Sequence, residues 1–145
     1  MGNKERKTII VEKPEDFEKV PKNFGGEVHV KGYCKITHDI TLYGSLMVEG
    51  VLDVDGKISI DKDLHVSGAM YCYNLDVFRN TLVRGLLECE NLCVHDDLSA
   101  HGIVDCIDLK VYDKLSGEGL IKASGEIDFL NTSFNGRIEN STSLV

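Results

Sequence analysis

Seven glycines recur at a nearly constant spacing through most of this chain. Successive members are 18, 18, 17, 17, 17 and 17 residues apart. The seven are Gly32, Gly50, Gly68, Gly85, Gly102, Gly119 and Gly136. Such a period is typical of repeat architectures, in which each unit packs mainly against the units before and after it. The chain is therefore expected to fold as a stack of similar coils, with glycine at a corner whose dihedral angles other residues avoid.

Each repeat carries three pairs of apolar residues, and one residue separates the two members of a pair. In the second repeat the pairs are Leu52/Val54, Ile58/Ile60 and Leu64/Val66. Residues i and i+2 of a strand point to the same side, so each pair predicts one short strand. In the third repeat the last pair is either Thr81/Val83 or is centred on Leu82. Three strands with turns between them close a triangle, and we name its sides the first, second and third face in chain order.

Stacked triangles predict an all-β, single-domain parallel β-solenoid of six to seven coils, each of 17–18 residues, around an apolar centre. Composition agrees, because the chain has 25 Val and Ile residues but only three Ala, and no proline after Pro21. A β-sandwich would need frequent hairpin turns, yet Asn-Gly and Asp-Gly occur once each. The repeat therefore favours the solenoid.

Residues 1–24 do not share the repeat, so we divide the chain into an N-terminal tail and cap, 1–24, and a solenoid, 25–145. The segment Lys13–Val20 predicts a short helix, because proline stands at its start and acidic residues follow in its first turn. Phe17, Val20 and Phe24 are expected to cover the first coil, whose strand edges and core would otherwise be bare.

Charge and cysteine content exclude several classes of function. The formal net charge is −8, and the chain after residue 24 carries −9 because residues 1–24 hold six basic and five acidic side chains. A body this acidic repels a phosphate backbone, which argues against nucleic-acid binding. We find no transmembrane segment or signal peptide, and five cysteines, an odd number, indicate a reducing cytoplasm. Peripheral membrane contact through residues 1–7 remains an open expectation.

The sequence predicts no catalytic, metal or cofactor site. All coils have nearly the same length, so no inserted loop builds a pocket, and the histidines fall at different positions of the repeat. We therefore interpret His29, His38, His65, His95 and His101 as surface residues. An inward column of Cys72, Cys89 and Cys106 fills a narrow wall rather than forming a redox or metal ladder. Cys93 should point outward and be the most reactive thiol.

Two surface features leave alternatives open. Acidic residues along the first face either bind cations or keep that face solvated; they are Asp53, Asp55, Glu88, Glu90, Asp105 and Asp108. Apolar residues follow most of the repeated glycines, and the strip consists chiefly of Tyr33, Val51, Leu86, Ile103 and Leu120. This lateral strip is either a half-buried corner, for which the Thr8–Val11 segment is a candidate cover, or an exposed surface for lateral association.

The coils resemble those of the bactofilins, bacterial polymer-forming cytoskeletal proteins. The resemblance rests on glycine corners followed by aliphatic residues, as in Val48-Glu49-Gly50-Val51-Leu52, Val66-Ser67-Gly68-Ala69-Met70, Val83-Arg84-Gly85-Leu86-Leu87 and Phe134-Asn135-Gly136-Arg137-Ile138. It implies a right-handed triangular β-helix that assembles end to end into non-polar filaments without nucleotide. This chain departs from the family in its sparser glycines, its more acidic body and an N-terminal segment, 8–24, that looks structured.

The leading hypothesis is a non-enzymatic, self-assembling scaffold whose partner is another copy of itself. Self-association is expected at the C-terminal coil through Ile127, Phe129, Phe134 and Ile138, as a tail-to-tail pair. One alternative is a rigid binding module that uses a side face. A further alternative is an enzyme similar to the hexapeptide acyltransferases, which the lack of loops disfavours.

Overall fold

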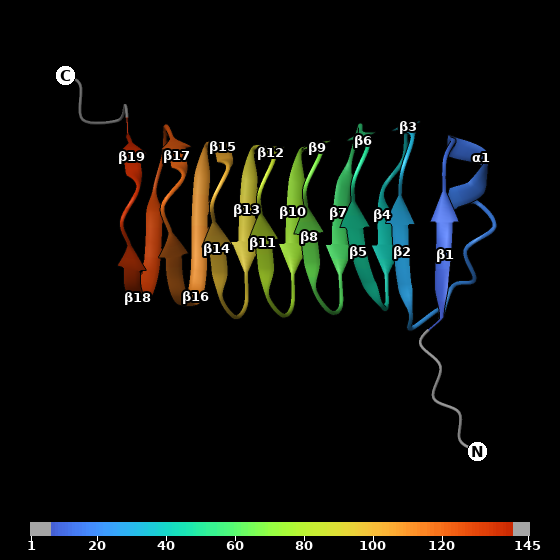
Figure 1. The fold of residues 1–145 in the computed structure, drawn as a ribbon, viewed down its shortest axis with the longest axis horizontal. Helices are drawn as coiled ribbons and strands as arrows, with labels where there is room; N and C mark the ends of the chain where they lie inside the picture. The colour runs from blue at the N-terminus through green and yellow to red at the C-terminus, as the bar shows by residue number, and fades with distance from the viewer. Residues whose placement is uncertain (1–6, 141–145) are drawn as a thin grey trace, which may run out of the picture.

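Columns of short parallel strands run along the whole length of the molecule (Figure 1). The structure is a computed structural model that describes residues 7–140. It shows an all-β parallel solenoid of about eight turns, which confirms the predicted fold class. The number of turns exceeds the expected six to seven because the N-terminal segment adds a strand to the stack.

Each face of the solenoid is one column of strands. The first face holds β3 (Tyr33–Ile36), β6 (Val51–Val54), β9 (Ala69–Tyr71), β12 (Leu86–Glu88), β15 (Ile103–Cys106), β17 (Leu120–Ala123) and β19 (Arg137–Glu139). The second face holds β4 (Ile40–Leu42), β7 (Lys57–Ile60), β10 (Asn74–Val77), β13 (Asn91–Val94) and the first parts of β16 (Asp108–Gly117) and β18 (Ile127–Phe134). The third face holds β1 (Thr8–Val11), β2 (Glu27–Val30), β5 (Ser45–Val48), β8 (Leu64–Val66), β11 (Thr81–Val83), β14 (Leu98–Ala100) and the later parts of β16 and β18.

The apolar pairs point into the centre of the coils, as the alternation predicts. Leu92 and Val94 of β13 are buried, whereas Cys93 between them is only half-buried. Each strand pairs in register with its equivalent one coil away, so that Leu75, Leu92 and Leu109 form one buried column. The core is therefore a continuous rod of aliphatic side chains along the axis.

The third pair of the third repeat is Thr81/Val83, because both side chains are buried while Leu82 lies outward. The Thr81 hydroxyl has no hydrogen-bond partner and is fully enclosed. A buried hydroxyl without a partner loses its hydration and gains nothing in return. The Thr81 hydroxyl therefore destabilises the otherwise apolar core at this position.

The repeated glycines are required for a different reason from the one expected. Among residues 7–140 only Gly117 has a positive φ, of 112°, so unusual dihedral angles do not explain the other positions. A Cβ atom at any of the seven glycines would lie closer than 3.0 Å to backbone atoms of the preceding turn. From Gly50 onward the nearest such atom is the carbonyl oxygen of the preceding glycine of the series. The corner therefore needs glycine because consecutive turns approach too closely for any side chain.

Short polar side chains close the corner between the second and third faces. The Asp63 carboxylate accepts a hydrogen bond from the Asn80 backbone N–H at 3.0 Å, and the Asn80 side-chain oxygen accepts one from the Asp97 N–H at 3.1 Å. Asp97 accepts the next bond, from the Lys114 N–H, at 3.1 Å. Lysine has no acceptor atom in its side chain, so this series ends at Lys114.

The N-terminal boundary differs from the expected one. β1 pairs in parallel with β2, and Val11 is fully buried, so the strand ladder begins at Thr8 rather than at residue 25. The helix α1 (Pro14–Phe17) follows β1 and has proline in its first turn, as expected. Asp16 accepts hydrogen bonds from the backbone N–H groups of Glu12 and Lys13, which lower the pKa of its carboxyl group. β1, α1 and the side chains of Val20 and Phe24 thus belong to the end of the solenoid.

We predict that Gly85→Ala destabilises the protein by about 1–3 kcal/mol, because the new methyl group must displace backbone atoms of Ser67 and Gly68. Gly25→Ala is the matched control, since only the flexible Lys62 Nζ lies near its Cβ position, at 3.9 Å. Urea unfolding followed by circular dichroism measures both variants. Equal unfolding midpoints for the two alanine variants would contradict the close-approach explanation.

A second prediction concerns Thr81, whose hydroxyl can be replaced by a methyl group of similar size. Thr81→Val should stabilise the fold by roughly 1–3 kcal/mol, because it removes a buried polar group that has no partner. The change is measured as a rise in the midpoint of thermal or urea unfolding. Thr41→Val, at an outward and exposed position of β4, is the control and should leave the midpoint nearly unchanged. An unchanged or lower midpoint for Thr81→Val would show that the hydroxyl is satisfied.

Candidate functional sites

The C-terminal end of the solenoid is not covered by any strand of residues 7–140. β18 pairs only with β16, and β19 is the last strand of the first face (Figure 1). The inward positions Ile127 and Phe129 are partly exposed, whereas Leu109 and Val111, their partners one coil earlier, are buried. Ile138 is 41% exposed, although its partner Ile121 is fully buried. The structure thus places the core of the last coil at a partly open surface.

Phe134 occupies an inward column in which the preceding side chains become smaller toward this end. The column runs through Val83, Ala100 and Gly117, and Phe134 pairs with Gly117. Its ring reaches toward Gly136, where a Cβ atom would lie only 2.7 Å from the ring carbon Cζ. The large ring therefore fills space that the small residues beneath it leave, and it remains partly exposed because no further coil covers it.

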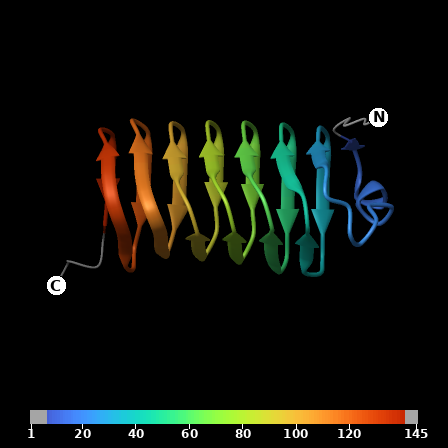
Figure 2. The same ribbon diagram turned by 90° about the horizontal axis from the view of Figure 1, so that it is seen from below.

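The N-terminal end is arranged differently. Phe17 is buried, and Val20 and Phe24 pack against the core while remaining partly exposed. α1 contacts β1 and β3, and a small hollow of about 180 Å³ separates the cap from Ile40 and Leu42 of β4. Figure 2 shows the helix at the tip of the rod, beyond the first complete coil. Side chains therefore shield part of this end, in contrast to the C-terminal one.

The lateral strip is continuous along the first face. Tyr33 pairs with Val51, and Leu86 pairs with Ile103, which pairs with Leu120. Tyr33 and Ile103 are exposed and the other members of the strip are half-buried. The alternative in which Thr8–Val11 covers the strip is wrong, because that segment pairs with β2 on the third face. The strip is therefore a half-buried corner for three of its five members and is exposed at Tyr33 and Ile103.

Five of the six acidic residues of the first face, all except Asp108, border a hollow of about 390 Å³ above the cysteine column. At one end the Lys35 ammonium group lies 3.3 Å from Asp53 and 3.4 Å from Asp55, which it partly neutralises. The three thiols beneath are buried, as predicted. A hydrogen bond with Cys72 and burial raise the pKa of Cys89, and burial raises the pKa of Cys106 to about 12. Cys89 and Cys106 are therefore protonated at neutral pH, as expected of packing residues.

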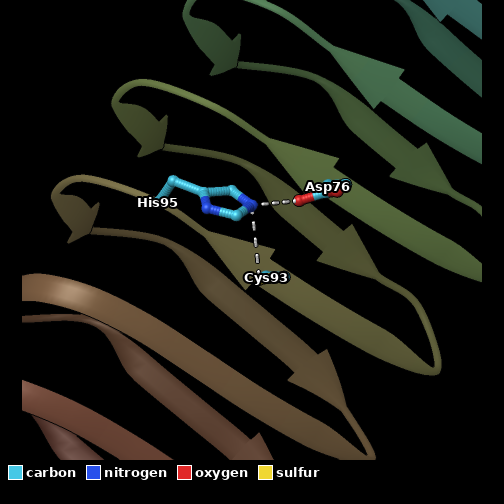
Figure 3. A group of neighbouring side chains, drawn as sticks. All are labelled: Asp76, Cys93 and His95. Atoms are coloured by element: carbon cyan, nitrogen blue, oxygen red, sulfur yellow. Dashed lines mark hydrogen bonds and ion pairs between the residues drawn. The ribbon is translucent and has the colours of Figure 1, made fainter.

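A cluster of side chains with metal-binding and nucleophilic groups lies on the outer side of the second face (Figure 3). His95 Nε2 is 2.7 Å from Asp76 Oδ1 and 3.7 Å from Cys93 Sγ. Asp76 comes from β10, Cys93 comes from β13, and His95 follows Cys93 at the end of that strand. The sequence pattern predicted His95 to be a surface residue without a site, whereas the structure places it beside Asp76 and Cys93.

Aromatic rings enclose the imidazole of this cluster. Phe78 stacks on His95 with ring centroids 4.5 Å apart and an interplanar angle of 8°. Tyr112 stacks on the other side at 4.8 Å and 19°. The Lys110 ammonium group lies 4.8 Å from the centre of the Tyr112 ring. The stack holds the plane of the imidazole, so that Nε2 remains directed at Asp76 and Cys93.

The cluster does not have the arrangement of a nucleophilic triad. In a triad the imidazole uses one nitrogen for the nucleophile and the other for the carboxylate. Here the same nitrogen, Nε2, faces both Cys93 and Asp76. Burial and the nearby Asp76 carboxylate also raise the pKa of Cys93, which opposes formation of the thiolate. Cysteine-type acyl transfer is therefore not supported by this geometry.

A signal for the cluster was present in the sequence. Asp76, Cys93 and Lys110 are separated by 17 residues, and so are Phe78, His95 and Tyr112. Residues one period apart become neighbours on adjacent strands, as the observed register shows. Comparing outward positions at that spacing, as we did for the inward cysteines, would have placed these groups side by side.

Comparison of the chain with protein-family models, curated proteins and solved structures found no match. Within residues 7–140 no helix is long and apolar enough to cross a membrane. Residues 1–6, which make up most of the segment considered for peripheral membrane contact, lie outside the described part of the chain.

We predict that brief alkylation of the native protein modifies Cys93 before the buried thiols Cys34, Cys72, Cys89 and Cys106. The alkylation rate at Cys93 should still increase as the pH rises past 9.0, the ordinary pKa of a cysteine thiol. The reason is that the pKa of Cys93 is raised, so its thiolate forms only at higher pH. Peptide mass spectrometry after a short reaction measures the order. Modification of Cys89 ahead of Cys93 would contradict the assignment of inward and outward sides.

Proposed function

We propose that the protein is a self-associating structural scaffold, similar to the bactofilins, which assembles through its C-terminal coil without nucleotide. The two ends of the rod differ in a way that supports this proposal. Inward residues are almost fully buried in the middle coils, but Ile127, Phe129, Phe134 and Ile138 remain partly accessible. An apolar surface at the end of a strand stack is a template for another copy of the chain.

The backbone of the last coil adds to this template. β18 runs from Ile127 to Phe134, and its outer edge has no partner strand within residues 7–140. An unpaired strand edge offers backbone N–H and C=O groups in a row. A second copy that meets this edge satisfies those groups and covers the apolar side chains in the same contact. This open edge is the observation that carries the proposal.

The proposed contact is a tail-to-tail pair related by a two-fold axis. Head-to-tail stacking would require a bare N-terminal end, but Phe17, Val20 and Phe24 cover part of that end. A two-fold axis brings two identical surfaces together and needs no such exposed partner. A pair closes on itself, so longer polymers require a second contact. The lateral strip, with Tyr33 and Ile103 exposed, is the surface that we assign to it.

A second candidate function rests on the same strip. A continuous row of apolar side chains on a rigid rod also suits a binding module that presents one side face to another macromolecule. In that case the protein remains a monomer and substitution of strip residues abolishes binding of the partner. The two candidates are therefore separated by substitutions at the end and on the side.

We predict that Ile138→Arg and Phe134→Arg each abolish the tail-to-tail pair and lower the mass of the assembly, because a guanidinium group cannot be buried unpaired in the contact. Ile138 is already 41% exposed, so its substitution is expected to leave the fold intact. Size-exclusion chromatography with light scattering measures the mass, and circular dichroism checks folding.

Tyr33→Arg, on the lateral strip and 59% exposed, is the matched control. It should retain the dimer and shorten any filaments seen by electron microscopy. If both end variants are folded and keep the wild-type mass, the C-terminal contact is wrong. A wild-type protein that is monomeric at all concentrations would favour the binding module.

A further inference from the structure

We propose that Asp76, Cys93 and His95 bind one divalent transition-metal ion of the zinc type. Their oxygen, sulfur and nitrogen donor atoms all lie within 4.8 Å of one another (Figure 3). The strands that carry them are adjacent and in register, since Asp76 pairs with Cys93. The three side chains are partly buried at a surface from which an ion can enter. This inference does not depend on the proposed self-association.

Without a metal ion, His95 Nε2 can make only one of its two contacts as a hydrogen bond. His95 Nε2 faces Asp76 Oδ1 at 2.7 Å and Cys93 Sγ at 3.7 Å. If Nε2 carries a hydrogen, it donates to Asp76 and cannot accept from the thiol. If Nε2 is unprotonated, its lone pair accepts from the thiol but then faces a carboxylate oxygen. A cation between the three atoms lets all of them act as electron-pair donors at once.

The distance between the His95 nitrogen and the Cys93 sulfur is close to that of a tetrahedral site, and the distance between the His95 nitrogen and the Asp76 oxygen is shorter. Zinc–ligand distances of about 2.0–2.3 Å imply nitrogen–sulfur and nitrogen–oxygen separations of roughly 3.6 Å and 3.3 Å. The separation between His95 and Cys93 already agrees with the first value. The Asp76 oxygen is about half an ångström too close for a ligand of this type. Asp76 is 28% exposed and therefore has room to make this adjustment by rotation of its side chain.

The neighbouring coils orient the imidazole for this role. Phe78 and Tyr112 stack on the two sides of His95, one from the coil before it and one from the coil after it. Rotation of the imidazole out of this stack would lose both ring contacts. A ligand whose direction is set in advance loses less conformational entropy when the ion binds. This feature distinguishes His95 from His29 and His101, for which no ring contact is found among the described residues.

The charges are suited to a divalent cation. Asp76 and the Cys93 thiolate together supply two negative charges, and the thiol proton leaves to solvent when the metal binds. Lys110 pairs with Cys93 across the strands and opposes the ion, but its ammonium group is held over the Tyr112 ring. Oxygen, sulfur and imidazole nitrogen together favour zinc or cobalt over magnesium or calcium. Water can occupy the fourth position because the three side chains are partly exposed.

Cobalt(II) titration of the full-length protein tests the proposal. We expect one equivalent to bind, with a near-ultraviolet sulfur-to-cobalt charge-transfer band and visible bands of tetrahedral intensity. Added zinc should displace the cobalt. Cys93→Ser should abolish the charge-transfer band, and His95→Gln should weaken binding by more than about tenfold. Circular dichroism confirms that the substituted proteins are folded.

His101→Gln is the matched control. His101 is paired with Glu118 at 2.8 Å, and its side chain is 32% exposed, as is that of His95, but no thiol joins this pair. This substitution should leave cobalt affinity and spectrum unchanged. A charge-transfer band that persists in Cys93→Ser would assign the metal to the buried cysteines and overturn the proposal. Absence of the band in the wild type, or equal loss in His95→Gln and His101→Gln, would leave His95–Asp76 as an ion pair only.

Discussion

The close approach of consecutive turns is the constraint on which this structure depends. Parallel strands lie only about 4.8 Å apart, so every coil must place its corner directly on the backbone of the previous one. At the glycine corners there is no room for a Cβ atom, and the carbonyl oxygen of one glycine lies against the next. The same spacing brings equivalent side chains together. Buried aliphatic columns, the corner bonds of Asp63, Asn80 and Asp97, and the stack on His95 all follow from it.

A strand stack of this kind is stable in its middle and incomplete at its ends. Each inner coil is covered on two sides, whereas a terminal coil has an unpaired edge and a partly exposed core. The two ends of this chain resolve the problem differently. The N-terminal end adds β1 and places Phe17 of α1 against the core. At the other end the last described strands are β18 and β19, and Phe129 and Phe134 of β18 are only partly covered. This asymmetry underlies the proposed tail-to-tail contact.

Repetition along the outer surface also creates chemistry that no single coil contains. Asp76, Cys93 and His95 are ordinary surface residues in their own strands, and they meet because adjacent coils are in register. The aromatic residues Phe78 and Tyr112 reach the imidazole for the same reason. A solenoid without inserted loops can therefore still assemble a polar site, provided that the site spans several coils. The proposed C-terminal contact and the proposed metal site lie on separate surfaces of the rod.

The periodic glycines and apolar pairs were sufficient to predict the fold class, the inward cysteine column and the outward position of Cys93, because strand alternation and coil length are local properties of the chain. The same patterns did not reveal that β1 joins the ladder, since Thr8–Val11 is separated from its partner strand by the helix α1. They left Thr81 undecided, because a threonine is compatible with either side of a strand. The 17-residue spacing could have placed the coils of Asp76 and His95 side by side, but the contact between the two side chains was decided by the tertiary structure. That contact depends on how side chains leave adjacent coils and on the ring stack that directs the imidazole.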